Sequence, residues 1–148
     1  MCQQRIDEAE AHLFACLSAV DIDSNIEVAC AIRYNLAKCA LLRGNASVGL
    51  SWVRQALEMA ASGRLQTLSG LAWGLKGAAH HMSGQTDEAR AAYEQSIGLL
   101  GRPSDATVCD EIRGRLAMLD HVIAPPTDNL FERLLRGAIA HGSDPAEG

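Results

Sequence analysis

Residues 73–93 read WGLKGAAHHMSGQTDEARAAY, and this stretch decides the fold. Apolar and small residues recur at intervals of three and four up to Gly84, which is the spacing of one face of an α-helix. Gly84 is a typical helix stop, and Thr86 is placed to cap a second helix that carries Asp87 and Glu88 in its first turn. The stretch therefore predicts two helices joined by a tight turn.

Similar turn signals divide the chain on both sides of this stretch. Gly63 is placed to end a helix, while Ser24 or Asn25, Asn45 and Ser104 are placed to cap the next ones. We expect seven helices, over residues 6–20, 24–43, 45–61, 65–82, 86–100, 104–122 and 127–140.

The composition agrees with a helical domain. The chain has 148 residues, a formal net charge of −5, 48% hydrophobic side chains and 4% aromatic ones. Its 24 alanines and 18 leucines favour helix, and the β-branched residues that favour sheets are sparse. We therefore predict an all-α fold with a single domain over residues 1–141, followed by a flexible tail at 142–148.

The charge pattern limits the classes of partner. An isoelectric point near 5.5 with no run of Lys or Arg argues against direct binding to nucleic acid. No stretch approaches the ~20 apolar residues that cross a bilayer, and the start of the chain lacks the apolar core of a signal peptide. The five cysteines form no closely spaced pair. We expect a cytoplasmic protein with reduced cysteines and no membrane partner.

Comparison of the chain with itself reveals a repeat of 40 residues. Gly44 and Gly84 each end one helix and open the next, and Asp87-Glu88-Ala89 repeats Asp7-Glu8-Ala9 at twice that separation. Three further series follow the same shift: Ala37, Gly77 and Ala117; Cys39, Ala79 and Leu119; and Leu36, Lys76 and Leu116. In the last series the middle copy departs, because a lysine stands between two leucines.

Five residues of the opening stretch, Trp73, Gly77, Gly84, Ala89 and Tyr93, resemble the pattern of a tetratricopeptide repeat. The period of 40 resembles the longer-helix variant found in large bacterial regulators. The resemblance implies that Gly77 and Ala89 let two helices approach closely, while Trp73 and Tyr93 fill the space around them. It also implies a right-handed α-solenoid of antiparallel helix pairs.

The resemblance places helix pairs at about 24–62, 64–100 and 104–140, after an unpaired helix at 6–20. The other copies depart from the pattern, since Gly49 and Val53 replace the alanine and the aromatic residue, and Pro125-Pro126 interrupts the last turn. Residues 6–20 align with second helices, so the first helix of their pair is missing. We expect a piece of a longer array, with an unusual N-terminal cap as the alternative.

The concave face of such a solenoid is the expected binding site for a peptide or helix of a partner. The inner positions of the family, carried onto this sequence, give eight partner-binding candidates: Tyr34, Lys38, Leu41, Ala78, His81, Glu111, Met118 and His121. The partner would bury the apolar members, and the polar members would orient it. Lys38 is the one lysine among them, so this face does not resemble the basic, Asn-rich groove that grips a C-terminal carboxylate.

Residues with catalytic or metal-binding potential are better explained as packing groups. His80 and His81 are adjacent, so on a helix they point about 100° apart and cannot share a metal ion as an i, i+4 pair can. Cys30 and Cys39 are expected to pack in the interior. No nucleophile-elbow, phosphate-loop or dinucleotide motif occurs. We expect no enzyme activity, no cofactor and no resident metal.

These patterns together predict a non-catalytic protein–protein interaction module or scaffold. We expect it to be a regulatory or sensor segment of a bacterial signalling or transcription-regulating protein. Two alternatives stay open. One is a secretion-type chaperone of similar repeats, although the usual repeat of about 34 residues counts against it. The other is a helical domain that binds a small ligand or a metal through His81 and His121.

The ends of the chain also offer apolar surface. The last expected helix carries an apolar stripe at Leu130, Phe131, Leu134 and Leu135, which we interpret as a cap over the final repeat. An exposed stripe of this kind, or the open edge of helix 6–20, would instead favour a homodimer through the terminal helices.

Overall fold

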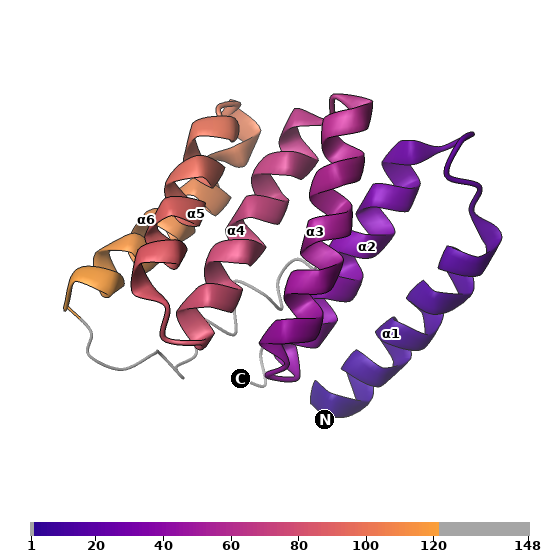
Figure 1. The fold of residues 1–148 in the computed structure, drawn as a ribbon, viewed down its shortest axis with the longest axis horizontal. Coiled ribbons are helices and arrows are strands. Elements are labelled where there is room, and N and C mark those ends of the chain that lie inside the picture. Colours follow the sequence, from indigo (N-terminus) through magenta and orange to yellow (C-terminus); the bar gives the residue numbers. More distant parts are fainter. Residues whose placement is uncertain (1, 122–148) are drawn as a thin grey trace.

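The computed structural model describes residues 2–121, whose regular elements are α-helices and one 3-10 turn (Figure 1). The helices are α1 (Cys2–Ala19), α2 (Ile26–Leu42), α3 (Ala46–Gly63), α4 (Gln66–Met82), α5 (Thr86–Leu99) and α6 (Ala106–His121), and the 3-10 turn is η1 (Pro103–Asp105). The predicted all-α class is confirmed. The expected helix at 127–140 and tail at 142–148 lie outside the described residues. None of the described helices has the length and apolar composition needed to cross a bilayer.

Helices that follow one another in the sequence lie side by side in space (Figure 1). Short turns join α2 to α3, α3 to α4 and α4 to α5, so each of these helices runs back along the previous one. Contacts also link α2 to α4, the first helices of two expected pairs. The described chain is therefore a row of helices with α1 at one edge.

Two turns that lie 40 residues apart, at Gly44 and Gly84, have the same geometry. Their φ angles are +82° and +76°, in the left-handed region where glycine avoids a steric penalty. In each turn, the N–H of the residue after the glycine donates to the carbonyl five residues earlier, at 2.8 and 2.9 Å. These hydrogen bonds satisfy carbonyls that the end of a helix would otherwise leave unpaired.

The turn between α3 and α4 uses a different residue type at the same place. The left-handed residue is Arg64, with φ 56°, rather than the expected Gly63, which is the last residue of α3. The following N–H, of Leu65, still donates to the Ala60 carbonyl at 2.8 Å. Arg64 therefore adopts a backbone conformation that disfavours a side chain.

The expected helix caps are found at two of four positions. The side chains of Asn25 and Asn45 each accept a hydrogen bond from the N–H three residues on, both at 3.2 Å. Thr86 is instead the first residue of α5, and Ser104 lies inside η1. Consequently α5 begins without a side-chain cap, and α6 begins after a 3-10 turn.

The buried side chains form two clusters. The first joins α2, α3 and α4 through Cys30, Tyr34, Ala37, Leu41, Val53, Ala56, Ala60, Ala72, Leu75, Ala78 and Ala79. The second joins α5 and α6 through Ala89, Tyr93, Leu100, Cys109, Ile112 and Leu119. The partly buried Leu71 packs against both clusters.

One hydrogen bond between helices recurs at the 40-residue shift. The thiol of Cys30 in α2 donates to the Ala56 carbonyl in α3 at 3.3 Å. The equivalent positions are Gly70 in α4 and Ser96 in α5, where the serine hydroxyl donates to the glycine carbonyl at 2.6 Å. The donor is on the first helix in one pair and on the second helix in the other, but the hydrogen bond joins equivalent positions in both pairs.

The close approach of α4 to α5 depends on Gly77. A Cβ atom there would lie 2.5 Å from the ring of Tyr93, which is fully buried. In the preceding pair of helices Ala37 and Val53 occupy the equivalent positions, and both are buried in the first cluster. Ala37 on α2 is larger than Gly77, and its neighbour Val53 on α3 is correspondingly smaller than Tyr93. The expected roles of Gly77 and Tyr93 are confirmed.

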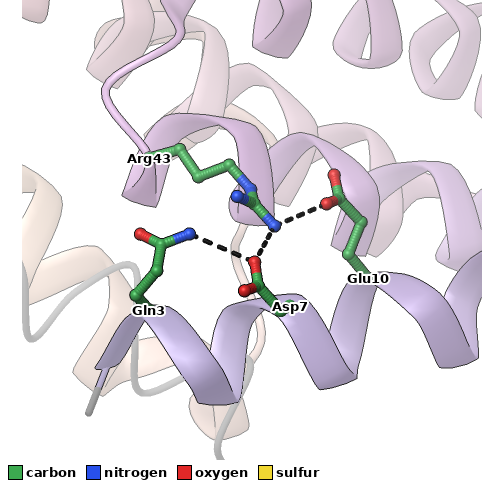
Figure 2. Close-up of polar contacts among 4 residues, drawn as sticks. All are labelled: Gln3, Asp7, Glu10 and Arg43. Atoms are coloured by element: carbon green, nitrogen blue, oxygen red, sulfur yellow. Dashed lines mark hydrogen bonds and ion pairs between the residues drawn. The ribbon is translucent and has the colours of Figure 1, made fainter.

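The edge helix α1 is attached mainly by polar and aromatic contacts. Arg43, just after α2, pairs with Asp7 at 2.5 Å and with Glu10 at 2.7 Å, and Gln3 donates to Asp7 at 3.1 Å (Figure 2). Toward α3, Phe14 meets Trp52 edge to face with ring centroids 6.0 Å apart. Among the described side chains of α1 only that of Ile6 is buried.

Candidate functional site

The structure places the predicted partner-binding residues in different environments. Five of them are buried: Tyr34, Lys38, Leu41, Ala78 and His81. Glu111 and Met118 are half-buried on α6, and the side chain of His121 lies outside the described part. Their role in binding a partner stays a prediction. These five residues are therefore buried, whereas the prediction required them to be exposed in an open groove.

Lys38 illustrates this difference. Its side chain is 2% exposed, and its Nζ lies 4.4 Å from the centre of the Tyr34 ring. Burial lowers the pKa of Lys38 to about 7 and raises that of Tyr34. The predicted role in orienting a partner requires an exposed Lys38, whereas the buried side chain packs on an aromatic face.

His81 belongs to a buried polar cluster that joins α4, α5 and α6. Arg115 donates from Nη2 to His81 Nδ1 at 2.9 Å and from Nε to the Tyr93 hydroxyl at 3.1 Å. The guanidinium is always a donor, so Nδ1 of His81 must accept and the ring proton lies on Nε2. Burial and the Arg115 charge together lower the pKa of His81 to about 4.

This cluster bears on the alternative of a metal site at His81 and His121. The His81 nitrogen that contacts the cluster faces a guanidinium, which disfavours a second cation there. Over the described residues, no group of three or more metal-ligating side chains is brought together. Sequence reasoning did not single out Arg115, since a lone arginine on a helix is usually a surface residue.

Cys30 and Cys39 are packed in the interior, as expected. Burial raises the pKa of both thiols, that of Cys39 to about 11. Because the thiolate is the reactive form, this environment favours packing over nucleophilic chemistry.

One recess among the described residues is a cleft between α3 and α4, with a volume of about 470 Å³. It is lined by Leu50, Val53, Arg54, Leu57, Glu58, Ala61, Lys76 and His80. The α3 members recur at intervals of three and four, so they form one face of that helix. We call this recess the α3–α4 cleft. Leu50, Val53 and Leu57 form the apolar part of its lining, which we call its floor, while Arg54 and Glu58 are exposed beside it.

The α3–α4 cleft coincides with a break in the 40-residue repeat. Lys76 and His80 are half-buried in its α4 wall. The equivalent residues of α2 are Leu36 and Ala40, which are 0% and 2% exposed. Two core positions of the preceding helix are thus occupied here by polar side chains that line a recess. The substitution at Lys76 was visible in the sequence, but its connection to a cleft was not.

The charges around the α3–α4 cleft are unevenly placed. The chain reverses at Arg64, so Arg54, ten residues before the reversal, and Lys76, about as far after it, lie at one level of the antiparallel pair. Glu58 is one helical turn nearer the reversal. Lys76 Nζ lies 4.5 Å from the centre of the Trp73 ring. The cleft therefore has a cationic end and an acidic end.

His80 is held by a neighbour at the cationic end. Its Nδ1 lies 2.6 Å from Oε1 of Gln85, so the ring donates to the amide oxygen. The other ring nitrogen, Nε2, is not engaged by this contact. This hydrogen bond fixes the orientation of the ring at the wall of the cleft.

In comparisons with known proteins, no protein-family model, no curated protein and no solved structure matches the chain.

Proposed function

We propose that this chain is a non-catalytic, tetratricopeptide-like interaction module that binds a helical segment of a protein partner in the α3–α4 cleft. The observation that carries the proposal is the cleft itself, with an apolar floor and a volume of about 470 Å³ at the break in the repeat. We propose this cleft as the binding site in place of the buried candidates Tyr34, Lys38, Leu41, Ala78 and His81.

The tetratricopeptide-like part of the proposal is supported by contacts that recur after 40 residues. The Cys30–Ala56 and Ser96–Gly70 hydrogen bonds join equivalent positions of two helix pairs. The turns at Gly44 and at Gly84 share one geometry. Stacked helix pairs bury their apolar faces against each other and leave long surfaces for partners, which is the usual role of such arrays.

A helical occupant is favoured by the dimensions of the cleft. The lining residues of α3 extend from Leu50 to Ala61, a stretch of twelve residues that spans about 16 Å at 1.5 Å per step. Over that distance a partner helix presents three apolar side chains, one per turn, which is the usual anchor pattern of a helix in a groove. Leu50, Val53 and Leu57 supply the apolar surface that these anchors would cover.

A displayed library of helix-forming peptides with randomised surface positions provides the test. We expect it to yield binders whose affinity falls at least tenfold in Leu57→Glu, since a carboxylate in the apolar floor opposes burial of the anchors. Val48→Glu is the matched control, because Val48 is on the same helix, 41% exposed, and outside the cleft. An absence of binders, or binders equally affected by both variants, would refute the proposed function.

A further inference from the structure

We infer that the helix bound in the α3–α4 cleft carries an acidic side chain that pairs with Arg54 and Lys76. This inference rests on the proposed function and specifies its partner: an amphipathic segment with a carboxylate beside its apolar anchors. Three features of the cleft support it.

The first feature is that neither cation has a carboxylate partner within the described part of the chain. Within residues 2–121, the ion pairs formed by basic side chains do not include Arg54 or Lys76. Glu58 is four residues from Arg54 on the same helix, yet the two do not form an ion pair. The contact recorded for Lys76 is the face of Trp73. As far as residues 2–121 are concerned, both positive charges are therefore available to an incoming anion.

The second feature is the cost of covering Lys76. At this position of the preceding helix, Leu36 is fully buried, so a partner that fills the cleft removes water from a site suited to a core side chain. Taking an ammonium group out of water is costly unless an opposite charge accompanies it. An occupant without an anion would bury Lys76 unpaired, whereas a carboxylate would form a charge-assisted hydrogen bond with it.

The third feature is the position of Glu58. It lies one turn from the level of Arg54 and Lys76, toward the reversal of the chain at Arg64. A partner with acidic residues along its whole length would place one of them against Glu58 and be repelled. The cleft therefore selects a segment with one acidic end, and this requirement fixes the direction in which the partner helix lies.

The test uses the full chain and three synthetic helical peptides. All three carry leucines one turn apart, and they differ at one flanking position, which is Glu, Gln or Lys. Binding is measured by fluorescence anisotropy at low and at high salt. We expect the Glu peptide to bind about tenfold more tightly than the Lys peptide, with a difference that shrinks as salt screens the charges.

Charge reversal supplies the decisive comparison. In Arg54→Glu with Lys76→Glu, the preference should invert so that the Lys peptide binds more tightly. The control is Arg102→Glu with Arg113→Glu, which changes the net charge equally at exposed positions outside the cleft. It should leave the preference unchanged. Far-UV circular dichroism and cooperative urea unfolding establish that the variants are folded.

The outcomes separate this inference from the proposed function. If peptides bind in a Leu57-dependent manner but show no preference among Glu, Gln and Lys, the acidic-partner inference is wrong and the binding module stands. If the control reverses the preference as fully as the cleft variant does, the selectivity comes from net charge and the inference is also wrong. If no helical peptide binds while sodium decanoate does, and Leu57→Glu abolishes that binding, the occupant is a small amphiphilic anion. Both proposals then fail.

Discussion

Replacement of Gly77 by alanine tests whether the close packing of α4 on α5 requires a residue without a side chain at this position. In an unhindered helix this substitution stabilises a protein by about 1 kcal/mol, because glycine loses more backbone entropy on folding. At Gly77 the added Cβ would lie 2.5 and 2.6 Å from two ring carbons of Tyr93. We therefore expect the sign of the effect to reverse.

The magnitude follows from the lack of room for the ring to move. Tyr93 is fully buried, and its hydroxyl accepts a hydrogen bond from Arg115 at 3.1 Å. Inserting a methyl group into a packed core costs about 1–3 kcal/mol. After subtraction of the gain in helix propensity, Gly77→Ala should lower the free energy of unfolding by about 1–2 kcal/mol.

The Tyr93→Val background isolates the clash. Together with Gly77→Ala, this substitution gives the pair of residues that Ala37 and Val53 form in the preceding pair of helices. In that background, Gly77→Ala should raise the free energy of unfolding by about 1 kcal/mol, so the two substitutions should be coupled by about 2–3 kcal/mol. Urea unfolding of the four proteins, followed by far-UV circular dichroism, measures this coupling.

Two results would refute the reasoning. One is a stabilising Gly77→Ala in the natural background, which would mean that the ring has space to move. The other is an equal cost of Gly77→Ala in both backgrounds, which would place the strain somewhere other than Tyr93. Ala37→Gly serves as the control, and we expect it to destabilise by about 1 kcal/mol because no ring occupies that space.

Three further predictions concern single residues. Arg64→Gly should raise the free energy of unfolding by up to about 1 kcal/mol in urea unfolding, since the residue has φ 56° and glycine relieves the strain; an effect of opposite sign would show that the turn is not strained. Lys38 has a pKa of about 7 in the folded chain and an ordinary value of 10.5. Between these two pH values the unfolded chain binds more protons than the folded chain. The free energy of unfolding should therefore rise with pH by up to about 1.4 kcal/mol per pH unit. Urea unfolding at pH 7 to 8.5 should show this rise for the natural chain and a smaller slope for Lys38→Met, and equal slopes would contradict it. Arg43→Ala should speed amide hydrogen exchange in α1 while changing global stability by less than about 1 kcal/mol, because the Arg43 ion pairs are solvent-exposed; unchanged exchange would show that other contacts hold α1.

Much of the fold could be predicted because the signals are local. Helix starts and stops depend on cap residues and glycines a few positions apart, and all six described helices begin and end within four residues of the expected bounds. The exceptions are instructive. At Arg64 a residue other than glycine takes the left-handed turn position, and at Thr86 a helix begins without its expected cap.

The candidate site was harder to predict because it depends on relationships between helices. The repeat suggested which face each residue occupies, but it did not indicate that Tyr34 and Lys38 would be buried. The α3–α4 cleft also left a trace in the sequence, at the lysine that interrupts a series of leucines. Its meaning required the structure, since a lysine on a helix is usually a solvated surface residue.

The equal turns at Gly44 and Gly84 have a consequence for how chains of this kind change length. Removal of residues 45–84 would join Gly44 to Gln85 through the backbone geometry that each turn already has. In the shortened chain Ala37 would take the place of Gly77, and its methyl group would meet the ring of Tyr93. Loss of a repeat is thus compatible with the backbone geometry of the turns but not with the side-chain packing in the interior. Ala37→Gly would remove that clash, but Cys30 would still stand in the place of Gly70, where a Cβ would lie 2.8 Å from the side chain of Leu100.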